Sequence, residues 1–281
     1  MSNFFTRLFG KKGSDVPMRD VSALVTPFAT PAIQLVSNSA TSFSHFGGSP
    51  KLPPDIVWPE KGGMKLAFLA RLSLAEIQST LPIDWLPQSG ALLFFYDMEK
   101  RPWGYDPNDR GSSAVLLVPD LAVPAEQLDD RPNGNESPLP HRNVSFRRID
   151  VLRSLDLGTI DALNLTEEEI DEYCRISDIP FHDIPKHQIA GFPAPVQEDN
   201  MELECQLVSN GLFCGDANGY KDPRVPSLTP GAANWRLLLQ IDSDDDLGVM
   251  WGDCGTIYYW VEAHKAKVGN FANTWLVLQC T

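Results

Sequence analysis

Short apolar runs, separated by Pro, Gly and polar residues, make up most of the chain, and this pattern favours many short strands over long helices. The ranges that predict strands are Lys65–Leu72, Ala91–Tyr96, Ala114–Val118, Val144–Leu152, Met201–Val208, Trp235–Ile241 and Thr256–Val261. The last of these is aromatic or β-branched at nearly every position, which is typical of a strand covered on both faces. The pattern therefore predicts a β-rich α+β fold, with antiparallel sheets and few short helices.

Capping residues mark where helices are expected to begin. Leu74–Leu81 follows Ser73, an N-cap residue type, and Glu76 stands where a capping-box partner would. In NLTEEEIDEYC, Thr166 is expected to cap a helix while Glu169 reaches back to its amide. The acidic residues that follow then face the positive end of the helix dipole, so they have a structural explanation without any catalytic one.

The two halves of the chain share an outline. GGSP, KLAFLARLSL and GALLFFYD follow one another in the first half, and AGFP, WRLLLQIDSD and GTIYYWVE do so in the second. The spacings differ, so this is not a short tandem repeat of the solenoid type. Two interpretations stay open. One is duplication of a β-rich unit, with half-repeats at roughly 40–128 and 142–281, and the other is chance similarity between generic strand patterns.

The length of 281 residues, with 43% hydrophobic residues, allows a substantial core. We expect an N-terminal amphipathic or flexible segment over residues 1–17 and a single domain over residues 18–281. The segment MSNFFTRLFGKKG mixes apolar and basic residues. It is expected to dock on its own domain or stay disordered, with a membrane-surface helix as the alternative. The stretch Asp129–His141 is rich in Pro, Gly and Asn, which predicts a connector loop. No apolar run reaches the length of a membrane span, so an integral membrane protein is not expected.

The formal net charge is −14 and the isoelectric point about 4.7. Such a surface repels phosphate backbones, so a nucleic-acid partner is not expected. It suits a basic protein partner, although acidity also serves solubility alone. The five cysteines form no CxxC pair, and their odd number and wide spacing argue against a disulfide framework or a zinc knuckle. Reduced thiols in a cytoplasmic protein fit this pattern. The oligomeric state is left open.

An acidic stretch, DSDDDLGVMWGDCG, lies between the last two long predicted strands. Its spacing resembles an EF-hand loop, but Leu247 stands where that loop needs Gly, and Gly248 comes one position late. An exposed acidic turn is the favoured interpretation. A calcium or magnesium site is the alternative, with the candidate ligands Asp242, Asp244, Asp246 and Asp253. No other cofactor is expected.

Several polar residues and turn residues interrupt otherwise apolar β segments and form a candidate ligand site. They are Gly191, Pro193, Gln197, Gln240, Asp242, Trp251 and Asp253. Buried polar groups need partners, which a ligand would provide if the groups do not satisfy one another across the two halves. No catalytic residue is assigned. GGSP lacks the second Gly of a nucleophile elbow, and no P-loop or GxGxxG fingerprint occurs. The sequence therefore leans against an enzyme.

The series of blocks FGGSPKLPPDIVWP (Phe46–Pro59), HQIAGFPAPVQ (His187–Gln197), LLLQIDSD (Leu237–Asp244), MWGDCGTIYYWV (Met250–Val261) and NTWLVLQC (Asn273–Cys280) resembles the YwqG-like family. LLLQIDSD and WGDCG are its most specific parts. Arg71 departs from the family pattern, which more often has Gln there. This departure puts in doubt whether position 71 makes the same amide contact as Gln240.

The resemblance implies a soluble bacterial cytoplasmic protein with a β-rich α+β fold and no accepted activity. Some relatives are encoded beside polymorphic toxin systems, which implies an immunity-type binding role by association only. The acidic charge agrees with this role, because electrostatic steering would speed the capture of a basic toxin. The predicted function is thus a non-enzymatic protein-binding module with an acidic surface. The alternatives are a small-ligand-binding protein or hydrolase-type enzyme, and a divalent-cation-binding protein.

Overall fold

Antiparallel pairing joins ten strands into one curved sheet in the order β12-β11-β10-β9-β1-β8-β2-β5-β6-β7. The computed structural model describes residues 19–38, 40–48, 50, 52, 56–119, 139–182 and 184–281. The strands of the sheet are β1 (Thr30–Asn38), β2 (His45–Phe46), β5 (Ala67–Ser73), β6 (Ala91–Tyr96), β7 (Ser113–Val118), β8 (Arg142–Val151), β9 (Gln188–Ile189), β10 (Trp235–Asp242), β11 (Thr256–Glu262) and β12 (Trp275–Gln279). A separate hairpin joins β3 (Glu60–Lys61) to β4 (Met64–Lys65). The predicted N-terminal segment and most of the predicted Asp129–His141 loop lie outside the described residues.

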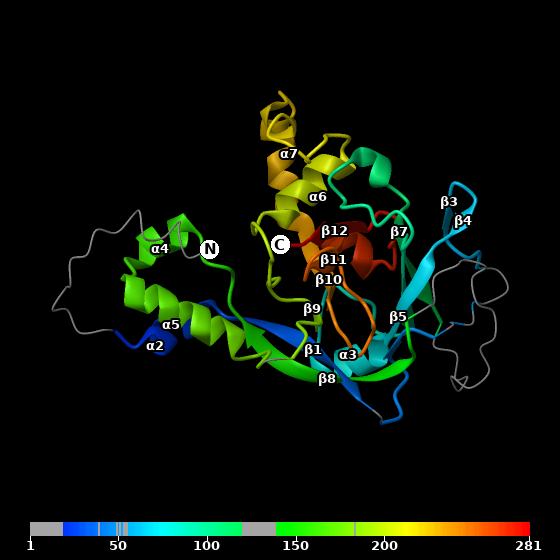
Figure 1. The fold of residues 1–281 in the computed structure, drawn as a ribbon, viewed down its shortest axis with the longest axis horizontal. Helices are drawn as coiled ribbons and strands as arrows, with labels where there is room; N and C mark the ends of the chain where they lie inside the picture. The colour runs from blue at the N-terminus through cyan, green and yellow to red at the C-terminus, as the bar shows by residue number, and fades with distance from the viewer. Residues whose placement is uncertain are drawn as a thin grey trace.

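The sheet curls until strands near its two ends meet, so that it nearly closes into a barrel (Figure 1). The Tyr259 hydroxyl on β11 donates to the Phe95 carbonyl on β6 at 3.0 Å. The rings of Phe94 and Tyr259 pack edge to face with their centroids 5.1 Å apart. The β6–β7 connection covers the free edge of β12, because the Leu278 amide donates to the Trp103 carbonyl at 2.9 Å. An unpaired sheet edge is thereby protected from pairing with another chain.

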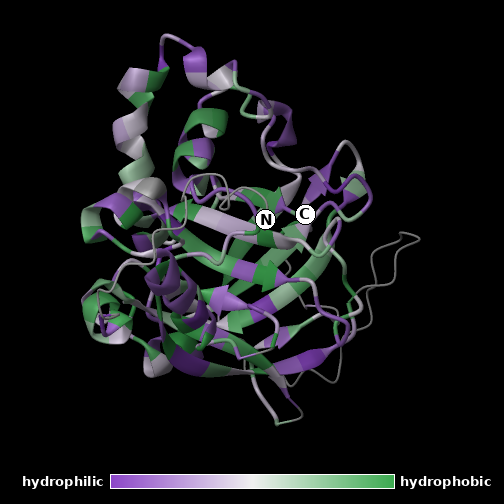
Figure 2. Ribbon diagram, turned by 60° about the vertical axis from the view of Figure 1, so that its left-hand side comes forward, coloured by the Kyte–Doolittle hydropathy of each residue, from purple (hydrophilic) through white to green (hydrophobic). Residues whose placement is uncertain are grey.

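Apolar side chains fill both faces of the central strands, and Figure 2 shows these strands as the most hydrophobic part of the ribbon. On β11, Ile257, Tyr259 and Val261 point into the curved sheet, while Tyr258 and Trp260 pack under a helix on its outer face. The prediction of a strand covered on both faces is confirmed at Thr256–Val261. The predicted β-rich α+β fold is likewise confirmed.

The described residues form seven short α-helices, which pack on the sheet or project from it. They are α2 (Val21–Val25), α3 (Leu74–Thr80), α4 (Leu157–Leu163), α5 (Glu167–Asp178), α6 (Met201–Ser209), α7 (Val225–Leu228) and α8 (Ala263–Lys267). The prediction of a strand over Met201–Val208 is wrong, because this range forms α6. Met201, Cys205 and Val208 are buried at the 3.6-residue spacing of one helix face.

Three of the helices, α2, α4 and α5, form a small lobe that projects from the barrel beside the ends of β1 and β8 (Figure 1). The lobe has its own apolar cluster, which includes Val21, Val25, Ile170 and Tyr173. We call residues 19–28 and 153–182 the helical lobe. Its longest helix is α5, which spans Glu167–Asp178.

The capping box predicted for the helix at NLTEEEIDEYC is present. The Glu169 amide donates to the Thr166 hydroxyl, and the Thr166 amide donates to the Glu169 carboxylate. Ser73 is the N-cap residue of α3, as predicted, but its side chain makes no cap hydrogen bond, so the predicted capping box with Glu76 is wrong. Glu76 instead accepts hydrogen bonds from the hydroxyls of Ser42 and Ser44.

The two halves of the sheet share details of register. β5 and β10 each have a register shift, between Phe68 and Ala70 and between Leu237 and Leu239. After the shift, Arg71 pairs with His45, while Gln240 pairs with Gln188. These details are compatible with duplication, which stays a prediction.

Candidate functional site

The residues predicted from the C-terminal strands meet a segment that crosses the sheet, residues 190–198, which we call the crossing segment. Gln240 is fully buried. Its Oε1 accepts from the Ala194 amide at 2.9 Å, and its Nε2 donates to the Lys186 carbonyl at 2.5 Å. Both polar ends of this side chain are therefore satisfied by backbone groups within the protein.

Side chains of the neighbouring strands hold the rest of the crossing segment. Nε2 of Gln188 on β9 donates to the carbonyls of Ala190 and Phe192 at 2.6 and 2.7 Å. The Tyr258 hydroxyl on β11 donates to the Ala194 carbonyl at 2.9 Å. Oε1 of Gln279 on β12 accepts from the amides of Val196 and Gln197 at 3.0 and 3.1 Å. β9, β10, β11 and β12 thus each supply one polar side chain that hydrogen-bonds to the backbone of the crossing segment, which is not itself a strand of the sheet.

Asp242 and Trp251 lie at the end of β10 and bond to the protein around them. The Asp242 carboxylate accepts from the Lys186 amide at 2.9 Å and from the Thr256 hydroxyl at 2.8 Å. Nε1 of Trp251 donates to the Asp242 carbonyl at 3.2 Å. Asp253 is exposed, and its carbonyl accepts from the backbone and side chain of Thr281. Asp242 and Trp251 come together, whereas Asp253 faces outward.

The predicted cation ligands are spread over this turn. Asp244 is buried and accepts from His187 Nε2 at 3.0 Å, and this hydrogen bond lowers the pKa of the carboxyl group. Asp246 and Asp253 are exposed. In the described part of the chain, no group of three His, Cys, Asp or Glu side chains is placed to hold a metal ion. The calcium or magnesium site stays a prediction, and these residues offer it no preformed ligand set.

A groove opens where the sheet splits between β1 and β10. β9 joins these two strands over only two residues, and the chain then turns away at Ala190 and Gly191, whose φ angles are +59° and +68°. A Cβ atom on Gly191 would stand 2.7 Å from side-chain atoms of both Ala32 and Val151, so the turn requires glycine. On this side the Ala190 amide donates to the Leu237 carbonyl at 3.2 Å, but the start of β10 has no paired strand there among the described residues.

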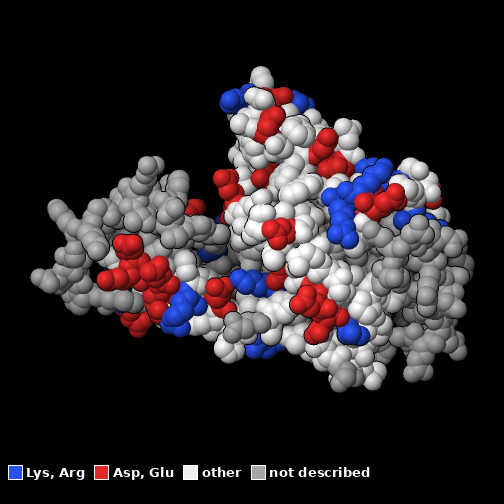
Figure 3. All heavy atoms as spheres, in the orientation of Figure 1, with Lys and Arg blue, Asp and Glu red and all other residues white. Residues whose placement is uncertain are grey.

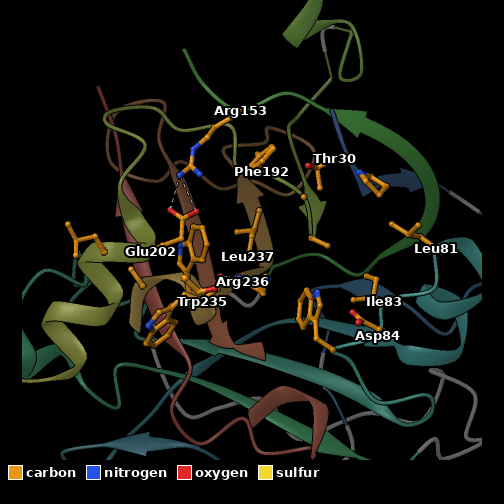
Figure 4. Close-up of a pocket in the computed structure, with 18 of the residues that line it drawn as sticks. Thr30, Leu81, Ile83, Asp84, Arg153, Phe192, Glu202, Trp235, Arg236 and Leu237 are labelled. Atoms are coloured by element: carbon orange, nitrogen blue, oxygen red, sulfur yellow. Dashed lines mark hydrogen bonds and ion pairs between the residues drawn. The ribbon is translucent and has the colours of Figure 1, made fainter. Parts of the chain in front are cut away.

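The groove has a volume of about 630 Å³. Its walls come from the starts of β1 and β10, the loop after α3, the start of the crossing segment and α6 (Figure 4). Trp85, Phe192 and Trp235 supply aromatic surface, and Leu81, Ile83 and Leu237 supply aliphatic surface. Of the seven predicted ligand-binding residues, all of which are described, Gly191 alone lines the groove.

One arginine of the groove is fully engaged. Arg153 pairs with Asp199 and Glu202 at 3.1 and 3.2 Å, as the dashed lines to Glu202 show in Figure 4. Its guanidinium also lies 5.4 Å from the centre of the Phe192 ring. The backbone carbonyl of Arg153 accepts from the Tyr173 hydroxyl of α5 at 2.8 Å, which ties the groove to the helical lobe.

Four other polar groups of the groove lack either a hydrogen-bond partner or an ion-pair partner among the described residues. Trp260 is 1% exposed, and its buried Nε1 has no hydrogen-bond partner among the described residues. The buried Asn200 Oδ1 is likewise without a partner there. Arg236 donates through Nη1 to the carbonyls of Ala233 and Trp235, both at 2.8 Å, but the described residues give it no carboxylate partner. Asp84 is exposed and forms no ion pair within the same residues.

Sequence reasoning missed these groove residues because they are far apart along the chain and have no motif. Gln188 and Gln279 had the same signal that pointed to Gln240, a glutamine within an apolar β-run. Applied uniformly, that signal would have found all three glutamines that hold the crossing segment, but not Tyr258.

A second polar cluster lies beneath α6. Burial raises the pKa of Glu204 to about 7, even though the Tyr220 hydroxyl donates to this carboxylate at 3.1 Å and opposes the shift. Oε2 of Glu204 is buried without a partner among the described residues. Burial likewise raises the pKa of the neighbouring Cys205 thiol, so this cysteine is unreactive.

The helical lobe carries much of the charge of the chain. From Asp156 to Asp178 there are eight acidic side chains and one basic one, a net charge of −7 out of −14 for the whole chain. Figure 3 shows the acidic side chains gathered on the projecting part of the molecule. Glu167, Glu168 and Asp171 on α5 are exposed. Glu169, in contrast, is buried against Arg19, and the hydrogen bonds from Arg19 lower its pKa to about 2.

Comparison with known proteins places the chain at the level of a family. Within the described residues, no helix combines the length and apolarity needed to cross a membrane. No curated protein matches the sequence significantly. A family profile matches residues 44–280, which cover the sheet apart from β1, the helical lobe after α2, the crossing segment and the groove apart from its β1 wall. The chain therefore belongs to the family described as a domain of unknown function, DUF1963.

Proposed function

We propose that this protein is a non-enzymatic, cytoplasmic binding module whose acidic helical lobe receives a basic protein partner. The observation that carries the proposal is the concentration of acidic side chains on one projecting lobe, whose nine acidic and three basic residues give it a net charge of −6 out of −14. A net charge spread evenly would serve solubility alone. A dense acidic face on a projecting element also attracts a basic partner over a longer range and orients it.

The lobe offers apolar contact surface beside its charge. Ile179, directly after α5, is 55% exposed, and Phe28, at the end of the α2 region, is also exposed. Protein interfaces combine such apolar side chains with a charged rim, in which the charges speed association and the apolar groups slow dissociation. The lobe is thus equipped for both parts of a binding reaction.

The similarity to the YwqG-like proteins extends this proposal to an immunity-type role, in which the basic partner is a toxin. The acidic lobe supports that role through charge complementarity. It would act by steering and covering the partner rather than by chemical conversion.

The experiment compares three forms of the full chain as baits in the native host. The lobe variant carries Glu167→Gln, Glu168→Gln and Asp171→Asn. The matched control carries Asp245→Asn, Asp246→Asn and Asp253→Asn, which remove the same charge from exposed sites elsewhere. Captured proteins are quantified by mass spectrometry at low and high salt. We expect a basic protein that the wild type and the control retain at low salt and the lobe variant loses.

Recovery of the same proteins with all three baits, or recovery of no basic protein, would refute the role of the lobe. A basic protein that the matched control loses as well would show that total charge, rather than the lobe, governs capture. That result too would overturn the proposal.

The alternative function, small-ligand binding, has support at a different place from the one predicted. Gln240, Asp242 and Trp251 bond within the protein. The groove beside Gly191 is the structural observation that favours a ligand.

A further inference from the structure

We infer that the groove between β1 and β10 binds a short free peptide with apolar side chains, about the size of a dipeptide. This inference is independent of the acidic lobe, because the residues that carry it lie outside the helical lobe. It rests on the shape of the groove, on two unpartnered polar atoms in its wall, and on two opposite charges at its surface.

The size and walls of the groove suit such an occupant. A volume of about 630 Å³ lies within the range of small-molecule sites, roughly 300–1,000 Å³. Trp85, Phe192 and Trp235 line it with ring surface that apolar side chains can cover. The polar groups are few and set apart, whereas a sugar of this size would need many hydrogen-bonding partners.

The unpartnered polar atoms match the two halves of a peptide unit. Nε1 of Trp260 is a donor only, so it needs an acceptor such as a carbonyl oxygen. Oδ1 of Asn200 is an acceptor and needs a donor such as an amide N–H. Buried polar groups of folded proteins are nearly always paired. An orphan donor and an orphan acceptor on two residues that line one groove therefore favour an occupant that supplies both, once the Trp260 and Asn200 side chains turn toward it.

The charges of the groove match the two ends of a free peptide. Arg236 has no carboxylate partner and Asp84 no cationic one among the described residues, although both line the groove. Arg153 is already neutralised by Asp199 and Glu202. A terminal carboxylate would bind Arg236 through charge-assisted hydrogen bonds, and a terminal ammonium group would bind Asp84. A simple anion would use only the first contact, and Asp84 would repel it.

The test is isothermal titration calorimetry with leucyl-phenylalanine as the probe. Two derivatives remove one terminal charge each, namely the N-acetyl dipeptide and the dipeptide amide. The protein is the full chain as wild type, as Arg236→Gln and as Asp84→Asn. Arg148→Gln and Asp245→Asn are matched controls at exposed positions outside the groove. All four substitutions are at exposed side chains, so the variants are expected to fold.

We expect the dipeptide to bind the wild type and both controls. Amidation should weaken binding to the wild type about tenfold and leave binding to Arg236→Gln unchanged. Acetylation should weaken it by a similar factor, and this loss should vanish in Asp84→Asn. This pattern assigns each terminus to its residue. A variant that lacks the charged partner should bind the dipeptide and the corresponding derivative with equal affinity.

A second readout follows the buried indole directly. In nitrogen-15 spectra, the Nε1–H signal of Trp260, assigned by its loss in Trp260→Phe, should shift when leucyl-phenylalanine is added. An absence of binding at millimolar dipeptide would overturn the inference, and so would equal affinities for the dipeptide and both derivatives. Tighter binding of 2-naphthoate than of the dipeptide would assign the groove to aromatic anions instead. An unmoved Trp260 signal at saturation would place the peptide elsewhere.

Discussion

Gln188 and Gln240 are register partners on neighbouring strands, and their side chains hydrogen-bond to the backbone before and after β9. Gln240 binds Lys186, before β9, and Ala194, after it, while Gln188 binds the carbonyls of Ala190 and Phe192. A strand of two residues has few ladder hydrogen bonds of its own. The two glutamines supply the remaining contacts, so this very short strand can bridge β1 and β10.

The first prediction concerns Gln240. Gln240→Leu should lower the free energy of unfolding by about 2–4 kcal/mol, because the Ala194 amide and the Lys186 carbonyl lose their partner while buried. The measurement is urea unfolding followed by tryptophan fluorescence. Arg236→Gln, at an exposed position of the same strand, is the control and should change stability by less than about 0.5 kcal/mol. Equal stability of the two variants would show that Gln240 does not hold the crossing segment.

The second prediction concerns Gly191. Gly191→Ala forces a Cβ atom onto Ala32 and Val151 and places a side chain at a φ of +68°. Gly248→Ala is a matched control, because Gly248 has a φ of +63° but nothing within 4 Å of the added atom. The control should cost about 1 kcal/mol from the backbone alone. Gly191→Ala should cost at least twice as much, as measured by the shift in the urea midpoint. A similar loss of stability in both variants would mean that Ala32 and Val151 move aside for the added methyl group at little cost.

The third prediction is a dependence of stability on pH. The pKa of Glu204 is raised from 4.5 to about 7 in the folded protein. Between these values, the unfolded chain releases its proton while the folded chain keeps it. The contribution of Glu204 to stability is therefore present below pH 4.5 and is lost as the pH rises through 7, with a total of roughly 3 kcal/mol.

Glu204→Gln removes this titration. From pH 4.5 to pH 7.5, the free energy of unfolding of the wild type should therefore fall relative to that of Glu204→Gln. Glu168→Gln, an exposed glutamate on α5, should show no comparable trend. A difference that stays constant over this range would contradict the raised pKa.

The fourth prediction concerns the helical lobe. Thr166→Ala removes the hydroxyl that caps α5 and should cost about 1 kcal/mol. The lobe has its own apolar cluster, so the loss is expected to appear as faster amide exchange in α4 and α5 with little change in β10 and β11. Thr229→Ala serves as the control, since this exposed threonine is outside the lobe. Faster exchange spread evenly over the sheet would show that lobe and barrel unfold as one unit.

The sequence predicted most strands that have a clear apolar pattern, although not β12 (Trp275–Gln279), and it failed where tertiary context decides. Ala91–Tyr96 matches β6 at both ends. β1, at the centre of the sheet, was not predicted, because TPAIQLVSN has Pro at its second position and contains Gln34 within its apolar part. In α6 the apolar residues fit both a strand and a helix, and packing against β10 and β12 selects the helix.

The candidate site was predictable only in part. A polar residue inside an apolar strand correctly marked Gln240 as a residue with a specific partner, but that partner is the crossing segment. The groove escaped prediction because it arises from the shortness of β9, which is a property of strand pairing and leaves no mark on residues as distant as Asp84 and Trp260.

The nine-residue ladder between β1 and β8 connects the helical lobe to the barrel, so it transmits movements of the lobe. At the lobe end, Thr30 begins β1 and Arg153 follows β8, and both residues also line the groove. A load applied to the lobe by a bound partner reaches the barrel through this ladder and through the chain that continues from the lobe to β9. Because Thr30 and Arg153 stand at the lobe end of the ladder, we expect a tilt of the lobe to displace them and change the width of the groove entrance.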